Sequence, residues 1–408
     1  MEVMTTAVDL RAPLARYASL LHATAGPTHH VASPLGAWLL AALCAPAAPG
    51  GSAELETALG VDLASASSIA RALLDDPHPA VLAAAALWLD RQPSAAVDSW
   101  LAALPSSVET GPLPSQPVAN AWADEHTLGL IKEMPLKIRP DTVLLLATAL
   151  ATKVSWVRPF TLAPSSRLGG PLADGVDQVL EMPDHGHDAF IARVPSIGDV
   201  AVHTGYAVEG LRVTSVIAPP STPASSVLAA AYDLAVASAT RGPIDRRSLY
   251  DLPVGDGPLW TIREEATRTT APGGREEVYK AVLPAWSASS EHDLNRPELG
   301  LPAAAGAAMS TLGVEGWHEA AQVAMARYTR VGFEAAAVSA MMVGVSAPIP
   351  QDGFRRTAEL RFGHPYAVVA VADRPWRDCW QPDTAEGAAW MGLPVFSAWV
   401  AQADEVTS

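Results

Sequence analysis

A long apolar stretch, Thr142–Val157 (TVLLLATALATKVSWV), constrains the fold of this chain most, because it separates two regions of different character. The stretch is rich in β-branched residues and has no helix cap, which predicts a central strand buried on both faces. Before it, apolar residues recur at helical spacing. After it, short apolar runs lie between Pro, Gly and Ser clusters, as is typical of strands. Helices followed by mainly antiparallel strands predict an α+β fold in one intertwined domain spanning residues 1–408.

The helical part covers residues 8–135. Ser33-Pro34 fits an N-cap followed by proline at the first helical position. The run Ala80–Leu89 (AVLAAAALWL) fits a strand or a helix, since periodicity does not separate the two. Helices are predicted at 10–21, 35–44, 64–74, 94–104 and 116–134, with one more inside the later region at 225–239.

The sheet-rich part covers residues 140–397. Its predicted strands, besides the long apolar stretch, are 178–181, 189–194, 200–203, 211–218, 279–283, 322–329, 366–372 and 388–396.

A run of small residues, Val331–Ala340 (VGFEAAAVSA), joins two of these predicted strands. Almost none of its side chains is large enough to anchor a core. Such a connector is flexible, and it is narrow enough to slide between other strands. Local sequence also allows an alanine-rich helix or a plain linker.

Composition limits the partners of this chain. There are 43 Asp and Glu against 27 Lys and Arg, a net charge of −16, which argues against nonspecific nucleic-acid binding. No apolar run is long enough to span a bilayer, so no membrane partner is expected. The first residues lack a secretory signal, which favours the cytoplasm, with export by another route left open. The two cysteines, Cys44 and Cys379, lie in apolar surroundings and are expected to be buried thiols.

Motifs for catalysis are absent from the sequence. It has no GxSxG elbow, Walker loop or GxGxxG. The tightest polar cluster, Asp184-His185-Gly186-His187-Asp188, lacks a third metal ligand at a defined distance, which favours a polar turn over a metal site. The pair His29-His30 is expected to lie in a solvated loop. Neither a metal nor a cofactor is expected.

Several segments, in order along the chain, resemble the serpin family. The most specific is Asn120–Lys132 (NAWADEHTLGLIK), which matches the family's N-x-W-x-x-x-x-T-x-G-x-I stretch. The other matches are Val31-Ala32-Ser33-Pro34-Leu35, the Lys153, Trp156, Pro159 and Phe160 pattern, Leu283-Pro284-Ala285-Trp286, His364-Pro365-Tyr366 and Trp390-Met391-Gly392.

This resemblance implies three mainly antiparallel sheets, about eight to nine helices and an exposed reactive-centre loop at about 332–358. In the family, a target serine endopeptidase cleaves the loop, which then inserts as a new strand into the largest sheet. The resemblance thus implies a monomeric pseudo-substrate, not an enzyme, with a metastable fold. The hinge of the loop would be Gly332, Phe333, Glu334, Ala335, Ala336 and Ala337. The gate of the sheet would be Ser33, Thr148, Trp156 and Gln322.

The chain departs from the family pattern at the hinge and the gate. Phe333 stands where inhibitors carry Thr or Ser, and a ring forced into a packed core costs about 1–3 kcal/mol. Gly36 replaces a second Ser, while Thr148 and Gln322 replace an Asn and a His; these two side chains could pair with each other. These departures also fit a second hypothesis, a non-inhibitory binding protein with the same fold. In that protein the Phe333 ring would stay fixed in a pre-existing pocket as a static anchor.

The resemblance places the cleaved bond in two alternative positions. Counting forward from Gly332 by the family's spacing gives Ser346-Ala347. Counting back from His364 gives Phe354-Arg355, because the loop is about eight residues longer than usual. Arginine would suit a trypsin-like enzyme, and Ser346 an elastase-like one. Either segment could also be a solvated turn.

Overall fold

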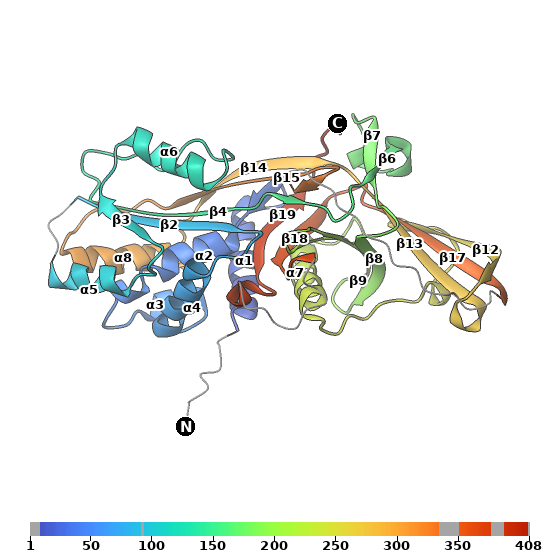
Figure 1. Cartoon of the computed structure of the whole chain (residues 1–408), viewed down its shortest axis with the longest axis horizontal. Coiled ribbons are helices and arrows are strands. Elements are labelled where there is room, and N and C mark those ends of the chain that lie inside the picture. The colour runs from blue at the N-terminus through green and yellow to red at the C-terminus, as the bar shows by residue number, and fades with distance from the viewer. Residues whose placement is uncertain (1–8, 91–93, 334–350, 377–386, 407–408) are drawn as a thin grey trace, which may run out of the picture.

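The computed structural model describes residues 9–90, 94–333, 351–376 and 387–406 (Figure 1). In this part the helices are α1 (Arg11–Ala25), α2 (Pro34–Ala42), α3 (Ala53–Leu59), α4 (Leu63–Asp75), α5 (Ala95–Ala103), α6 (Gln116–His126), α7 (Ala224–Thr240) and α8 (Leu301–Leu312). Several begin at a side-chain cap: Ser33, Ser52, Asp62 and Ser94 each accept a hydrogen bond from the backbone N–H three residues ahead.

The most deeply buried sheet lies at the centre of the molecule. Its strand order is β1-β19-β18-β10-β9-β8, and every pairing is antiparallel. All residues of β18 and β19 are buried, as expected for strands covered on both faces. Helix α7 packs on one face of this sheet. The strands are β1 (His30–Ala32), β8 (His187–Val194), β9 (Gly198–Tyr206), β10 (Leu211–Ile217), β18 (Tyr366–Ala372) and β19 (Pro394–Val400).

A second sheet protrudes at the end of the molecule away from the helices (Figure 1). Its order is β11-β12-β17-β13-β7-β6, with β13 parallel to β17 and the other pairs antiparallel. The strands are β6 (Thr161–Pro164), β7 (Gln178–Glu181), β11 (Gly255–Asp256), β12 (Trp260–Thr269), β13 (Arg275–Leu283) and β17 (Gln351–Arg361).

The third sheet is divided into two parts. One part has the order β3-β2-β4, the other is the pair β14-β15, and a short pair, β16-β5, lies at one end. Helix α6 lies on one side of these strands, and α2 and α8 lie on the other (Figure 1). The strands are β2 (Leu82–Leu89), β3 (Glu109–Pro112), β4 (Leu144–Ala151), β5 (Val154–Ser155), β14 (Trp286–Asp293), β15 (Ala321–Tyr328) and β16 (Gly332–Phe333).

These sheets confirm the α+β class and correct several predictions. The stretch Thr142–Val157 forms β4 and β5, but β4 is paired only with β2 and is an edge strand, not a central one. The helix expected over 116–134 ends at His126, because Leu128 and Gly129 adopt positive φ. In the ambiguous run Ala80–Leu89, residues Leu82–Leu89 form a strand, β2. At 388–396 a short 3₁₀ turn precedes β19.

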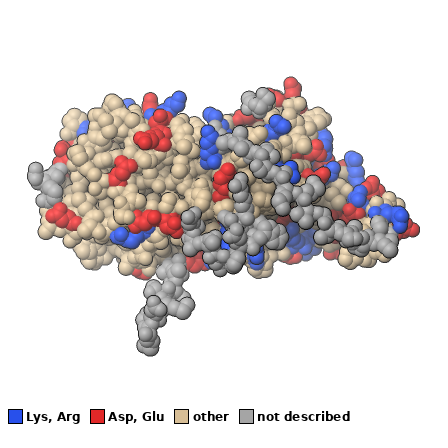
Figure 2. Space-filling view, viewed as in Figure 1, with Lys and Arg blue, Asp and Glu red and all other residues tan. Residues whose placement is uncertain are grey.

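Two further features of the described residues bear on partners. No helix among them combines the length and apolar character needed to cross a membrane. On the face shown in Figure 2, acidic and basic side chains are interspersed over a mostly uncharged surface. No broad basic patch is visible on that face.

Candidate functional site

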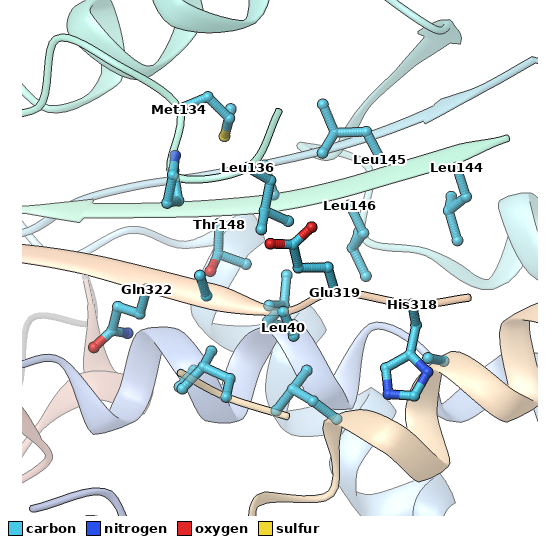
Figure 3. Close-up of a pocket in the computed structure, with 18 of the residues that line it drawn as sticks. Leu40, Met134, Leu136, Leu144, Leu145, Leu146, Thr148, His318, Glu319 and Gln322 are labelled. Carbon is cyan, nitrogen blue, oxygen red and sulfur yellow. The ribbon is translucent and has the colours of Figure 1, made fainter. Parts of the chain in front are cut away.

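The division of the third sheet leaves a cleft between β4 and β15. It encloses a cavity of about 450 Å³, which is lined by both strands, by α2 and α8 and by the segment that follows α6 (Figure 3). Most of the lining is apolar, including Leu40, Leu144, Leu146 and Met134. Each of the two strands has a partner on one side only, since β4 pairs with β2 and β15 pairs with β14. Two strand edges therefore border the same space, an arrangement suited to an extended peptide.

The first turn of α2 holds both sides of this cleft. The Gln322 side chain on β15 accepts a hydrogen bond from the Ser33 N–H (3.0 Å) and donates one to the Ser33 carbonyl (2.8 Å). On the other side, Thr148 Oγ1 on β4 donates to the Gly36 carbonyl (2.9 Å). These hydrogen bonds run from the two strands to the helix, whereas the sequence suggested a direct pair between Thr148 and Gln322.

Gly36 and Ser33 fit closely in this turn. Ser33 Oγ donates to the Val395 carbonyl on β19 (3.0 Å) and accepts from the Gly36 N–H (3.3 Å). A Cβ at Gly36 would lie 3.1 Å from Ser33 Oγ and 3.5 Å from Gln322 Nε2. The absence of a side chain at Gly36 therefore leaves room for the Gln322 amide. The Val395 partner was not foreseeable, because it lies far away in the sequence.

Replacing Gln322 by Ala is expected to destabilise the intact protein by about 1–3 kcal/mol, because the partly buried Ser33 N–H and carbonyl lose their partners. Urea unfolding of the Gln322→Ala variant measures this loss. Gln351→Ala is the matched control, since Gln351 is exposed and donates only a long bond of 3.3 Å to the Ala271 carbonyl. Equal midpoints for the two variants would contradict the assigned role of Gln322.

Trp156 fixes the turn at the upper end of the cleft, which is the end where β5 and β16 pair. It is 1% exposed; its backbone N–H donates to the Val331 carbonyl (3.1 Å), and its indole N–H donates to the Thr329 carbonyl (3.0 Å). The Phe160 N–H donates to the Arg330 carbonyl between them (2.9 Å). The gate residue expected from the sequence thus holds the segment that leads from β15 into the hinge.

The first two hinge residues already form a strand. In β16, Gly332 pairs with Ser155 and Phe333 with Val154, antiparallel to β5, and β16 also lies against β15. The Phe333 side chain points inward: it is 5% exposed, and its ring lies edge-on to Trp286 with centroids 6.4 Å apart.

A buried group of aromatic and histidine side chains lies beneath Trp156. His187 Nδ1 lies 3.0 Å from His203 Nε2, and the ring of Phe160 packs edge-on against His187 with centroids 4.5 Å apart. Burial lowers the pKa of His187 to about 4, and burial together with the neighbouring His187 lowers the pKa of His203 well below its usual value. Both imidazoles are therefore neutral at pH 7. The polar cluster 184–188 thus places its second histidine, which is partly buried, against buried aromatic side chains.

A second histidine cluster joins α1, β1 and β14. His22 Nδ1 lies 2.7 Å from His30 Nε2, and His22 Nε2 lies 2.7 Å from Ser397 Oγ. His292 Nε2 donates to the Val31 carbonyl (2.7 Å). The expectation of a solvated loop at His29-His30 is wrong for His30, which is 2% exposed. The misplacement has a simple reason: β1 pairs with β19, a strand distant in sequence, and this pairing draws His30 inward.

The remaining site predictions concern the hinge, the cleaved bond, the cysteines and metal binding. Ser346, Ala347 and the hinge residues Glu334, Ala335, Ala336 and Ala337 lie outside the described residues, as does Cys379. Cys44 is a buried free thiol. Among the described residues there is no group of three or more His, Cys, Asp and Glu side chains that could hold a metal ion.

The alternative bond, Phe354-Arg355, lies within β17. Phe354 pairs with Ala266 of β12 on one side and Arg275 of β13 on the other. The expected reactive loop at 332–358 therefore needs correction, because residues 351–358 belong to a strand that pairs with β12 and, from Phe354 on, also with β13, and not to an exposed loop. The physical reason is the hairpin β11–β12, which adds a neighbour to β17 and which the sequence did not predict.

Comparison with known proteins identifies the fold. No known family model matches the sequence, and no curated protein does. Solved structures do match. Tengpin, a thermophilic serpin, in its native state has a TM-score of 0.60 at 13% identity, covering 98% of this chain and 96% of its own. Human thyroxine-binding globulin complexed with thyroxine has a TM-score of 0.57 at 15% identity, and the match covers 96% of this chain and 97% of the globulin. Serpin48 from the insect Tenebrio molitor has a TM-score of 0.58 at 14% identity, and the match covers 99% of this chain and 100% of Serpin48.

The chain has the serpin fold over nearly its whole length. The resemblance found in the sequence is confirmed at this level. Within the fold, the cleft between β4 and β15 lies in the sheet that β16 enters, and the gate residues Ser33, Thr148, Trp156 and Gln322 all surround this cleft or its upper end.

Proposed function

We propose that this chain is a monomeric suicide-substrate inhibitor of a serine endopeptidase. The observation that carries the proposal is the two-edged cleft with β16 already paired at its upper end. A sheet with this gap can accept a strand that continues from Phe333. The sequence that follows, Glu334–Ala340, consists mainly of alanine and other small residues, which such a space accommodates.

The proposed reaction uses the chemistry of the partner enzyme. Its serine hydroxyl attacks the Ser346 carbonyl, the Ser346–Ala347 bond breaks, the amine of Ala347 takes the proton and leaves, and an ester links Ser346 to the enzyme. Residues 334–346 then extend into the cleft. At about 3.3 Å per residue they reach about 43 Å, more than the roughly 26 Å of the eight residues of β4. The attached enzyme is carried along before water hydrolyses the ester.

A mixing experiment tests the proposal. The protein is incubated with an elastase-like serine endopeptidase, and a covalent complex that survives SDS is expected, with a mass equal to the enzyme plus the chain up to Ser346. The same enzyme with its catalytic serine blocked should give no such complex. Cleavage by the active enzyme without a covalent band would show that the chain is an ordinary substrate.

A second function is favoured by Phe333. Its ring is already buried against Trp286, so it can serve as a fixed anchor that keeps β16 in place. In that case the fold would act as a binding protein, as thyroxine-binding globulin does with thyroxine. The Phe333→Ser variant separates the two functions. If the anchor limits insertion, this variant should form more covalent complex and less cleaved by-product than the unmodified chain, whereas a binding protein would form none in either case.

A further inference from the structure

The lower end of the cleft lies opposite the pair of β5 with β16. Strand β4 leads into β5, and β15 leads into β16, so β4 and β15 both begin at this lower end. Residues 139–142 precede β4, and residues 317–320 precede β15; both segments contribute to the lining of the cavity. A contact between these two segments therefore joins the two parts of the divided sheet.

Three side-chain contacts cross from one segment to the other. Arg139 Nη2 lies 3.1 Å from Glu319 Oε2. The same guanidinium group lies over the indole ring of Trp317, 4.7 Å from its centre. The Trp317 indole N–H donates to Asp141 Oδ2 (2.8 Å). In Figure 3, Glu319 points from the β15 side of the cleft towards β4. We call these four side chains, Arg139, Asp141, Trp317 and Glu319, the clasp.

The backbone on each side of the clasp is held in place. On the β4 side, Thr142 Oγ1 accepts a hydrogen bond from the Arg139 N–H (2.9 Å), and the Thr142 N–H donates to the Arg139 carbonyl (3.0 Å). On the β15 side, the Ala320 N–H donates to Asn295 Oδ1 (3.0 Å), and the Ala320 carbonyl accepts from the Leu294 N–H (2.9 Å). The side chains of the clasp therefore extend from fixed points on both sides of the cleft.

A strand that fills the whole cleft has to pass the clasp. The strand proposed above is about 43 Å long, whereas the eight residues of β4 span roughly 26 Å, so its far end runs beyond the start of β4. The clasp lies at that position, because Asp141 comes shortly before Leu144, the first residue of β4, and Glu319 shortly before Ala321, the first residue of β15. The contacts of the clasp and a full-length strand therefore compete for the same space.

We propose that the clasp keeps the lower end of the cleft closed in the intact chain and opens when a strand enters. This inference rests on the proposed function and concerns the regulation of the same cleft. Each contact is weak alone, since Arg139 and Glu319 are 52% and 43% exposed and exposed ion pairs contribute little. Arg139 takes part in two of the three contacts, so its removal should release most of the clasp.

Cys44 provides a direct measure of opening in the intact protein. Its thiol is buried and lines the same cavity. Burial raises the pKa of Cys44 to about 12, so the thiol should react slowly with iodoacetamide unless the cavity opens. In a chain with Cys379→Ser, which leaves Cys44 as the single thiol, mass spectrometry measures the alkylation rate under native conditions. Arg139→Ala is expected to raise this rate about tenfold.

A matched control and a charge exchange make the comparison decisive. Arg193→Ala should leave the rate unchanged, because Arg193 is also 52% exposed and pairs with Asp199 (3.2 Å) but does not line the cavity. Arg139→Glu sets two carboxylates side by side and should raise the rate further. Adding Glu319→Arg restores an ion pair and should slow the reaction again.

Three results would overturn the inference. The first is an equal alkylation rate for Arg139→Ala and the Arg193→Ala control. The second is a charge exchange in which Glu319→Arg has no effect on Arg139→Glu. The third is a faster reaction that is fully explained by lower global stability, which urea midpoints of the same variants reveal.

The same variants separate this inference from the proposed function. Alkylation of the intact protein needs neither an endopeptidase nor a cut. In the mixing experiment, Arg139→Ala should raise the ratio of covalent complex to cleaved by-product, because insertion meets less resistance. Faster alkylation without any covalent complex would refute suicide inhibition and leave the clasp in place. A covalent complex together with equal alkylation rates would refute the clasp alone.

Discussion

A backbone cut between residues 334 and 350 is expected to raise the melting temperature of the protein by about 10 °C. The cut releases the segment after β16, which can then extend between β4 and β15 and pair with both edges. In the intact chain, β17 is fixed in the protruding sheet and holds the far end of this segment. The cut chain gains a strand and loses a cavity, and both changes favour the folded state.

The size of this shift follows from the cavity. Filling a core cavity is worth about 24 cal/mol per Å³, so a volume of about 450 Å³ corresponds to on the order of 10 kcal/mol. The entropy of unfolding scales with chain length, and for 408 residues about 1 °C corresponds to 1 kcal/mol. Calorimetry of the intact and cut proteins at one scan rate measures the difference, because loop insertion changes the unfolding rate as well.

A matched pair of variants isolates insertion from other effects of the cut. Phe333 points inward, so Ala337 would also face the core of an inserted strand, whereas Ala336 would face outward. After cleavage, Ala337→Arg should keep the melting temperature of the intact protein, since burying an unpaired charge opposes insertion. Ala336→Arg should show the full increase. Equal behaviour of the two variants would refute insertion with this register.

Acid is expected to destabilise the intact protein strongly. Burial lowers the pKa of His22 to about 3, with the neighbouring His30 and His292 contributing. In the unfolded chain this pKa is about 6.5. The folded state therefore binds fewer protons between these values, and its stability is complete above pH 6.5 and declines as the pH falls towards 3. The lowered pKa of His22 alone removes about 1.4 kcal/mol from the free energy of unfolding for each pH unit in this range. The lowered pKa values of His30, His187, His203 and His292 act in the same direction.

Urea unfolding between pH 7.5 and 4.5 measures this dependence. The His22→Gln variant should lose less stability on acidification than the unmodified protein, and His185→Gln, at an exposed position, should behave like the unmodified protein. NMR titration of the imidazole protons gives the same answer without a variant. A His22 resonance that titrates near pH 6.5 in the folded protein would disprove the buried, neutral state.

Much of the fold could be predicted locally. The helix cap at Ser33 is in place, and the apolar runs 211–218 and 366–372 form strands of the central sheet. The gate residues Ser33, Thr148, Trp156 and Gln322 were assigned through the family resemblance; Ser33, Thr148 and Gln322 line one cleft, and Trp156 contacts the turn that follows β15. Their partners were not predictable, since the Val395 and Gly36 carbonyls reach the site through long-range packing.

The sequence by itself determined that helices come first and strands later, that the ring of Phe333 would oppose insertion if it faced inward, and that a narrow segment able to enter a sheet follows Gly332. These follow from spacing, caps and side-chain size, which act over a few residues. Only the tertiary structure decided that β4 and β15 stand apart, that His30 is buried and that Arg355 lies in a strand paired with both β12 and β13. Each of these depends on which distant strands become neighbours. That choice comes from the packing of the whole chain, and no short stretch of sequence encodes it.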